Sequence, residues 1–383
     1  MLEIKRVTAT LLVLATLFLS GCNAKEDELK DMALAQGLGI DYTDSEYNVS
    51  FMIYDLSKSR GSSAELSGTL TKVFKGSGVS VPYAITNITT MMGKKPYYSH
   101  NRVVVIGEDM AREGLQTVFD FLYRNAEVRP YVLVAVARGR AQDILDAKLG
   151  DALNPAEEIQ NVISVGAYYS YVAEIGIMDI AISTLEKTSD SYLPILELVK
   201  DGEDEQIKAS GTAIFNKMKL VGELNEEETK GLLWMNDLVE FGTLVCTTSY
   251  HNMVSSEIIE GDTDIEVVVE NGRIKYNVLV SCLLNVDQVD GKESNSLSRA
   301  QMHEIEQSYV DVIKGQINSA LNKCLIEYQS DVFRLGKRLW QSYPETYRQI
   351  ADTWRDSLAD LEFEIDVRVQ VSKTGEEGID INE

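Results

Sequence analysis

The sequence has few of the residues from which enzyme active sites are usually built, and it has none of the common catalytic motifs. Its three histidines are too far apart for a multi-histidine metal site: His100, His251 and His303. His303-Glu304 begins like a zinc-protease helix, but Gln307 stands where a second histidine is needed one turn later. Gly37-x-Gly39 lacks the third glycine of a dinucleotide-binding loop, and neither a phosphate-binding loop nor a nucleophile elbow occurs. We therefore predict no catalytic residue, no metal site and no cofactor.

Long apolar runs are also scarce, and the longest one lies near residue 1. Val7 to Leu19 is apolar apart from three threonines and follows the cations Lys5 and Arg6. It is shorter than the roughly 20 residues that a membrane-spanning helix needs. It ends in Leu19-Ser20-Gly21-Cys22, which resembles the lipobox of bacterial lipoproteins. We predict a signal peptide over residues 1–21, cleavage between Gly21 and Cys22, and diacylglycerol on Cys22, with an ordinary secretory signal as the alternative.

Basic residues are outnumbered by acidic ones. The chain has 36 Lys and Arg against 60 Asp and Glu, which gives a formal net charge of −24. The part after residue 21 carries −25, because Glu3, Lys5 and Arg6 together carry +1. A surface this acidic repels nucleic acid and anionic lipid headgroups. We therefore expect no nucleic-acid partner, and a protein held on the outer face of the cell membrane by lipid rather than by its own charge.

Cysteine is rare as well. Apart from Cys22, the chain has Cys246, Cys282 and Cys324. An odd number of cysteines at wide spacing is neither a disulfide framework nor a zinc-binding pattern. Each of the three lies in an apolar run or on an apolar helix face, so we predict buried free thiols.

Residues 22–200 alternate between strand and helix patterns, which is typical of a sheet covered by helices. We predict a short helix over Leu29–Ala35, a strand over Tyr47–Leu56 and a helix from Gly107 to about Asn125. Asn154-Pro155 has the residues that cap and begin a helix, which we expect to run to about Val172. The sequence therefore predicts an N-terminal α/β region of one lobe or two.

A charged, glycine-containing stretch, Asp201–Gln206, is the predicted domain boundary. Residues 205–383 are predicted to form a C-terminal α+β domain of antiparallel strands, with a hairpin turn at Asn271-Gly272. Apolar residues recur every three or four positions from Met302 to Tyr328, which predicts one long helix over Ser298–Tyr328. The predicted fold class is thus α+β, with two to three compact domains of mixed or antiparallel sheets covered by helices. The long C-terminal helix is expected to pack on an antiparallel sheet.

Two groups of aromatic residues suggest a partner surface. Tyr168, Tyr169 and Tyr171 are nearly adjacent, and a second group follows later in the chain: Trp340, Tyr343, Tyr347 and Trp354. Tyrosine and tryptophan are enriched at the energetic centres of protein interfaces, but they also fill cores. The pattern favours core packing for the second group and leaves both readings open for the first.

Four blocks of the sequence resemble the C-subunit lipoproteins of spore nutrient-germinant receptors, the Ger(x)C family. The first is Leu38-Gly39-Ile40-Asp41. The second covers residues 98–111 and continues to Arg124 and residues 127–129. The third covers residues 211–215, 220–224 and 228–234. The fourth is residues 331–336 with Pro344, Trp354 and Thr374-Gly375. The blocks follow the family's order, although the family's Trp-Asp-Arg-like start has no counterpart at Lys25–Leu29.

The resemblance implies a non-catalytic subunit of a membrane germinant receptor complex, which spores need in order to respond to nutrients. It implies two integral membrane partners, the A and B subunits, in the spore inner membrane, and it assigns a functional role to Cys22 alone. A solute-binding lipoprotein of a transporter is the main alternative. Such a protein should show repeated strand–helix units in both halves, whereas the second half here is mainly strands and one long helix. An extracytoplasmic hydrolase is the third candidate, and it would need the catalytic motifs that this sequence lacks.

Overall fold

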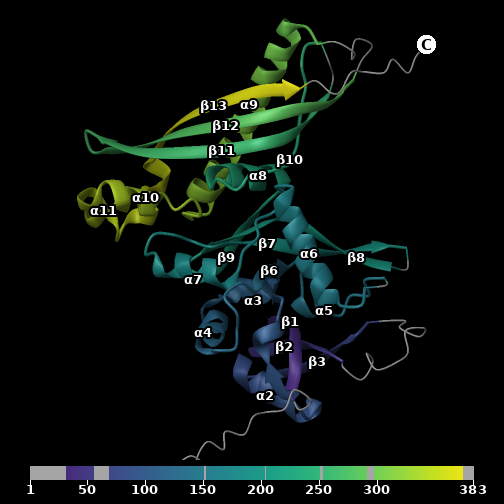
Figure 1. Ribbon diagram of the computed structural model, residues 1–383. Helices are drawn as coiled ribbons and strands as arrows, with labels where there is room; N and C mark the ends of the chain where they lie inside the picture. The colour runs from purple at the N-terminus through teal and green to yellow at the C-terminus, as the bar shows by residue number, and fades with distance from the viewer. Residues whose placement is uncertain are drawn as a thin grey trace, which may run out of the picture.

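The computed structural model describes residues 32–55, 69–150, 152–202, 204–250, 253–290 and 297–373 (Figure 1). The predicted signal peptide, Gly21 and Cys22 lie outside these residues. In the part that is described, two sheets lie toward opposite ends of the molecule with helices around and between them. No described helix is both long enough and apolar enough to cross a membrane.

Nine strands of the described residues form the first sheet: β1 (Met32–Thr43), β2 (Glu46–Tyr54), β3 (Thr71–Gly78), β4 (Lys95–Tyr97), β5 (Val103–Gly107), β6 (Leu133–Ala137), β7 (Tyr192–Asp201), β8 (Asp204–Asn216) and β9 (Lys219–Leu224). Their order is β3-β2-β1-β5-β6-β7-β8-β9, with β4 beside β1. The central strands β1, β5, β6 and β7 are parallel neighbours, and antiparallel strands extend the sheet on both sides.

Helices cover both faces of this sheet. One face carries α2 (Val81–Met92), α3 (Glu108–Glu113), α4 (Gln116–Arg124) and α7 (Ile177–Leu185); the other carries α5 (Ala141–Leu145) and α6 (Pro155–Tyr168). Every residue of β5 is buried, because Val104 and Ile106 face the first layer while Val103 and Val105 face the second. The continuous apolar run of β5 is therefore what a parallel strand between two helix layers requires.

Four strands form the second sheet, in sequence order: β10 (Gly242–Cys246), β11 (Val254–Glu270), β12 (Arg273–Val289) and β13 (Glu362–Lys373). The predicted hairpin turn joins β11 and β12, with Asn271 at φ 51° and Gly272 at φ 78°. The long helix α9 (Arg299–Leu321) packs on this sheet, and its predicted apolar stripe is buried at Ile305, Tyr309, Ile313 and Ile317. It continues into a π-helix, Asn322–Glu327, and shorter helices follow: α10 (Leu335–Ser342), α11 (Pro344–Ile350) and a 3₁₀-helix, Trp354–Asp360.

One helix, α8 (Glu226–Met235), lies between the two sheets (Figure 1). Asn225 caps it, since its side chain accepts a hydrogen bond from Glu228 N at 2.9 Å. All residues from Thr229 to Met235 are buried, which a surface helix would not show. The space between the sheets is therefore filled by protein.

Several local predictions for the first sheet are wrong. Residues 32–35 of the predicted helix Leu29–Ala35 begin β1, because pairing with β2 and β4 overrides helix propensity. The predicted helix from Gly107 to Asn125 is split into α3 and α4 at Gly114, which has φ 129°. The helix predicted to reach Val172 ends at Tyr168, because Ser170 takes a left-handed backbone. Asn154 stands at the predicted cap, but its side chain donates to Gln36 instead of capping.

The second sheet is mixed rather than antiparallel. Strand β13 runs parallel to β12, along a register from Lys275–Glu362 to Leu284–Val371. A parallel neighbour needs a crossover connection, and the segment from α9 to the 3₁₀-helix supplies it. The α+β fold class with mixed sheets is confirmed.

The predicted domain boundary, Asp201–Gln206, coincides with the turn between β7 and β8. These two strands are hydrogen-bonded partners in one sheet, and the chain changes sheet only after β9. The division into residues 22–200 and 205–383 stays a prediction.

Candidate functional site

The three cysteines of the described chain are core residues. Cys246, Cys282 and Cys324 are buried and unpaired, as predicted. Burial raises the pKa of Cys246 to about 11 and that of Cys282 to about 12, and it raises the pKa of Cys324 well above the usual thiol range. Thiols that stay protonated are poor nucleophiles and poor metal ligands.

The carboxyl ends of β1, β5 and β6 form the edge at which α/β sheets usually bind ligands. Asp41 closes this edge: its Oδ1 accepts a hydrogen bond from Ala141 N at 2.7 Å, and its Oδ2 accepts one from Gln142 N at 3.0 Å. Gly107 leaves room for the carboxylate, since a Cβ there would lie 2.0 Å from Asp41 Oδ1. Burial raises the pKa of Asp41. The protein's own carboxyl group therefore occupies the position in which a ligand's anionic group would bind.

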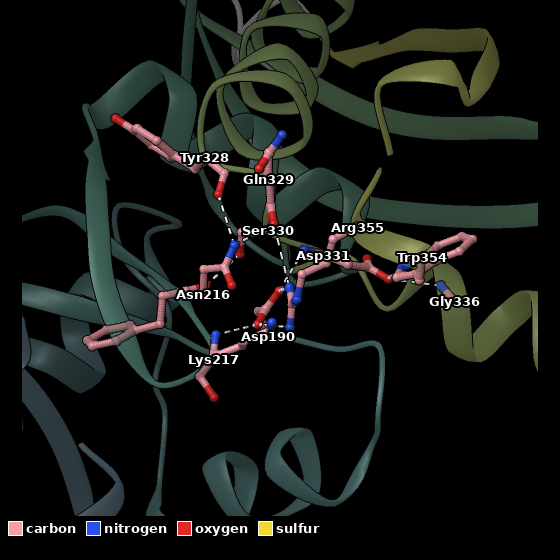
Figure 2. Close-up of polar contacts among 12 residues, drawn as sticks. Asp190, Asn216, Lys217, Tyr328, Gln329, Ser330, Asp331, Gly336, Trp354 and Arg355 are labelled. Carbon is pink, nitrogen blue, oxygen red and sulfur yellow. Dashed lines mark hydrogen bonds and ion pairs between the residues drawn. The ribbon is translucent and has the colours of Figure 1, made fainter. Parts of the chain in front are cut away.

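A buried polar cluster joins the two sheets (Figure 2). This junction cluster consists of Asp190, Asp331, Trp354 and Arg355. Arg355 holds both carboxylate oxygens of Asp190, with Nη2 donating to Oδ1 at 2.8 Å and Nη1 donating to Oδ2. The backbone N–H groups of Lys217 and Asp331 donate to the same carboxylate, each at 3.0 Å. The Asp190 side chain is only 2% exposed, so its charge is compensated inside the protein by the guanidinium and by these donors.

Asp331 organises the other half of the junction cluster. Its Oδ1 accepts a hydrogen bond from Leu335 N, and its Oδ2 accepts one each from Gly336 N and Trp354 Nε1, all at 2.9 Å. Gly336 permits this packing, because a Cβ there would lie 2.4 Å from Thr188 Oγ1. Complete burial raises the pKa of Asp331 to about 6, although the three donors favour the ionised form.

This titration predicts a pH dependence of stability. The folded protein holds the Asp331 proton more tightly than the unfolded chain, whose carboxyl has a pKa near 3.8. The contribution of Asp331 to the unfolding free energy should therefore fall by about 3 kcal/mol as pH rises from about 4 to about 6, and stay constant above that. Asp331→Asn keeps the shape but cannot titrate, so urea unfolding should show a shallower fall for the variant. Parallel pH profiles for the two proteins would contradict this assignment.

Further hydrogen bonds tie the β8–β9 hairpin to the end of the π-helix. Asn216 Nδ2 donates to Gln329 O at 2.7 Å, and Ser330 Oγ donates to Phe215 O at 2.6 Å. The Tyr328 hydroxyl donates to Glu223 O at 3.0 Å. Each of these contacts joins a side chain to a backbone carbonyl, so together they hold the β8–β9 hairpin against the segment that follows the π-helix.

Sequence reasoning did not identify Asp190 or Arg355. The two are 165 residues apart, and one more carboxylate is not distinctive in a chain with 60 of them. Residues 331–336 and Trp354 belong to the fourth block of sequence that resembles the Ger(x)C family. The sequence does not indicate that they contact one another, and the structure shows that they do.

A cavity of about 210 Å³ lies beside the junction cluster, between α7 and residues 332–334. Three of its charged lining groups are already engaged: Asp179 accepts from Gly176 N at 2.8 Å, Asp190 binds Arg355, and Arg334 pairs with Glu186 at 3.3 Å. No group of three or more potential metal ligands occurs among the described residues. The cavity is therefore part of the contact between the two sheets and their helices.

The first aromatic group is exposed and forms a surface with Phe241, which we call the tyrosine surface. Tyr168, Tyr169 and Tyr171 are 53%, 41% and 45% exposed. The Tyr168 ring stacks on Phe241 at 5.0 Å, and Tyr169 meets both rings edge-on. The buried Ser170 fixes this arrangement, because its Oγ donates to Phe241 O at 2.6 Å. Aromatic rings held in place before binding lose little entropy on docking.

An apolar groove of about 750 Å³ adjoins the tyrosine surface at Tyr171. It lies between α6 and β8, and its apolar lining includes Val162, Val165, Val199 and Ile207. Val165 is 56% exposed. Through Tyr171, the groove adds further exposed apolar area to the tyrosine surface.

The four residues of the second aromatic group differ in burial. Trp354 is 1% exposed, which confirms core packing for this residue, and Tyr343 and Tyr347 are partly buried against the core. Trp340 is 52% exposed, so core packing is the wrong prediction for it.

Together these features define an α+β protein of two joined sheets that exposes an aromatic surface. Two family models match it, "Spore germination protein N-terminal domain" over residues 25–198 and "Spore germination B3/ GerAC like, C-terminal" over residues 210–375. The chain belongs to the Ger(x)C family of spore germination proteins. The gap between the two models, residues 199–209, contains the predicted boundary Asp201–Gln206.

Similar proteins cover nearly the whole chain. Spore germination protein B3 of Bacillus subtilis (strain 168) is 23% identical, over 94% of this chain and 96% of that protein. Spore germination protein KC of the same organism is 25% identical, over 97% and 96%. The crystal structure of the GerBC protein matches with a TM-score of 0.58 at 19% identity, covering 88% of this chain and 98% of that one. That structural match supports the fold.

Proposed function

We propose that this chain is a lipid-anchored, non-catalytic subunit of a germinant receptor complex, needed for the germination response of spores to nutrients. Diacylglycerol on Cys22 holds it on the outer face of the cell membrane, and in the spore at the inner membrane. Its partners are two integral membrane proteins, the A and B subunits. Family membership across both halves of the chain supports this proposal, as do relatives named for spore germination.

The tyrosine surface is the observation that carries the docking function. Tyr168 and Tyr169 pack with Phe241 while staying exposed, and Tyr171 lines an apolar groove. Asp41, by contrast, fills the usual ligand edge of the sheet. Aromatic residues with apolar surroundings are typical centres of protein interfaces. The surface therefore fits assembly better than catalysis.

Lipid anchoring makes a modest interface sufficient. A chain held above the bilayer meets membrane-bound partners at a high effective concentration without any added contact. The tyrosine surface does not have to provide the affinity that a freely diffusing protein would need.

The arrangement of the sheets favours assembly over the alternative of a solute-binding lipoprotein. A two-lobed binding protein closes its lobes around a solute in an open cleft. Here α8 fills the space between the sheets, and its Trp234 is 1% exposed and donates to Gln316 Oε1 at 3.1 Å. At the end of α8, Asn236 Nδ2 donates to Val332 O at 3.3 Å, next to Asp331 of the junction cluster.

Cross-linking tests the docking surface. A photoreactive side chain at Tyr168 should capture the A or B subunit in spore membranes, because Tyr168 lies at the centre of the proposed interface. The same side chain at Tyr131, a tyrosine that is 83% exposed outside this surface, should capture much less. Equal capture from both positions, or none from Tyr168, would place the interface elsewhere.

A further inference from the structure

The second sheet has a long edge strand, β13, with which only one described strand pairs. β12 lies on one side of β13, and no described strand pairs with its other edge. Figure 1 shows this edge on the side of the second sheet that faces away from the first sheet. β13 has 12 residues, against 8 in β3, 6 in β9 and 5 in β10, which lie at the other sheet edges. β13 therefore has the longest unpaired edge among the described strands.

Proteins usually protect such an edge, and β13 lacks several of the usual devices. Its sequence contains no proline and no glycine, and its one register shift lies near its end, after Val371. Every second residue from Phe363 to Val371 is apolar and faces the core. Phe363, Ile365 and Val369 are nevertheless only partly buried in the single chain. A long apolar edge without such protection tends to pair with another strand.

One hydrogen bond indicates which backbone groups of β13 point outward. Val371 N donates to Glu306 Oε1 at 3.1 Å, so this N–H group points away from β12. The backbone groups of successive residues alternate between the two sides of a strand. The N–H and C=O groups of Ile365, Val367 and Val369 therefore point outward as well. Among the described residues, only Glu306 bonds to this edge, and it does so at the end of the strand.

The charges on the outer face of β13 are complementary to a second copy of the same strand. Asp366 and Arg368 are exposed, and their side chains form an ion pair at 3.2 Å. When two β13 strands run antiparallel with Val367 opposite Val367, Asp366 of each copy lies opposite Arg368 of the other. Opposite charges facing each other across two strands stabilise the pairing. In the same register Ile365 lies opposite Val369, so these partly buried apolar side chains cover each other.

The other acidic residues of β13 do not face like charges in this register. Glu362 and Glu364 pair with cations of β12, and the residues opposite them are the uncharged Ser372 and Gln370. Residues 374–383 contain four more acidic residues, which follow the last pair in the sequence. The negative net charge of each copy also opposes association, but such repulsion is screened over about 8 Å at physiological ionic strength. The backbone hydrogen bonds have to exceed what remains.

We propose that two copies of this chain pair through β13, antiparallel about a two-fold axis at Val367, so that their four-stranded sheets join into one continuous sheet. The three inner residue pairs exchange about six backbone hydrogen bonds. Asp366 and Arg368 form two ion pairs across the axis. The tyrosine surface lies outside this contact, because it adjoins β10 at the opposite edge of the sheet, where a Cβ at Gly242 would lie 2.6 Å from Tyr169 O. The dimer therefore presents two tyrosine surfaces.

Charge reversal tests this contact by sedimentation velocity. The chain from residue 22 onward, carrying Cys22→Ala, should sediment as a dimer at high protein concentration. Asp366→Arg leaves two cations on the edge and Arg368→Asp leaves two anions, so like charges face each other in either homodimer. Each variant alone should have a dissociation constant about tenfold higher. An equimolar mixture of the two variants should restore dimers of wild-type strength, because the two edges then carry opposite charges.

The matched controls reverse charges in an exposed ion pair elsewhere. Asp120 and Arg124 pair at 2.9 Å on α4, and Asp120→Arg or Arg124→Asp should leave the dimer unchanged. A wild-type chain that stays monomeric at the highest concentration would overturn the proposal, and an edge that pairs with a strand of another protein would give this result. So would a dimer that neither variant weakens, or a mixture that restores nothing. These outcomes leave the proposed anchor and the tyrosine surface untouched, which fractionation and cross-linking at Tyr168 test separately.

Discussion

Replacing Ile313 by Asp is expected to unfold the part of the protein built around the second sheet. Ile313 is fully buried at the middle of the α9 stripe, among apolar neighbours of the main core. A carboxylate introduced there would lie in an apolar environment without a partner. Such a change costs about 3–5 kcal/mol, a large part of the stability of a typical domain.

Gln307→Asp is the matched control for this change. Gln307 lies on the same helix but on its exposed face. The same carboxylate at that position should change the unfolding free energy by only about 0.5 kcal/mol. Urea unfolding of both variants measures the difference. Equal stability would show that the stripe is not buried and that the packing of α9 on the sheet is wrong.

Replacing Cys22 by Ala is expected to release the protein from membranes. Diacylglycerol contributes two acyl chains, and two hydrophobic signals are what stable anchoring needs, since one chain binds only marginally. The fold should be unchanged, because Cys22 is not among the residues that form the two sheets and their helices.

Cys282→Ala provides the comparison for the anchor. It also removes a thiol, but one that is buried in the second sheet. This variant should stay in the membrane fraction at the wild-type level. A Cys22→Ala protein that fractionates with membranes as completely as wild type would rule out lipid on Cys22 as the anchor.

The sequence predicts best the features that depend on neighbouring residues. The cap of α8 at Asn225, the turn at Asn271-Gly272 and the buried face of α9 each follow from a short pattern. The start of β1 and the direction of β13 depend on strands that are distant in sequence. No local sequence pattern predicts where β1 starts or in which direction β13 runs, because pairing with the neighbouring strand determines both.

The polar contacts of the junction cluster also could not be predicted from local sequence patterns. Asp190 and Arg355 form a buried pair only because β7 and the 3₁₀-helix meet, and neither lies in a motif that signals it.

The germination response of a strain that lacks the gene tests the central claim most directly. The account predicts that its spores form normally but fail to germinate with one set of nutrients, and that the wild-type gene restores the response while the Cys22→Ala gene restores it poorly. In a strain without a redundant paralogue, normal germination with every nutrient would contradict the account.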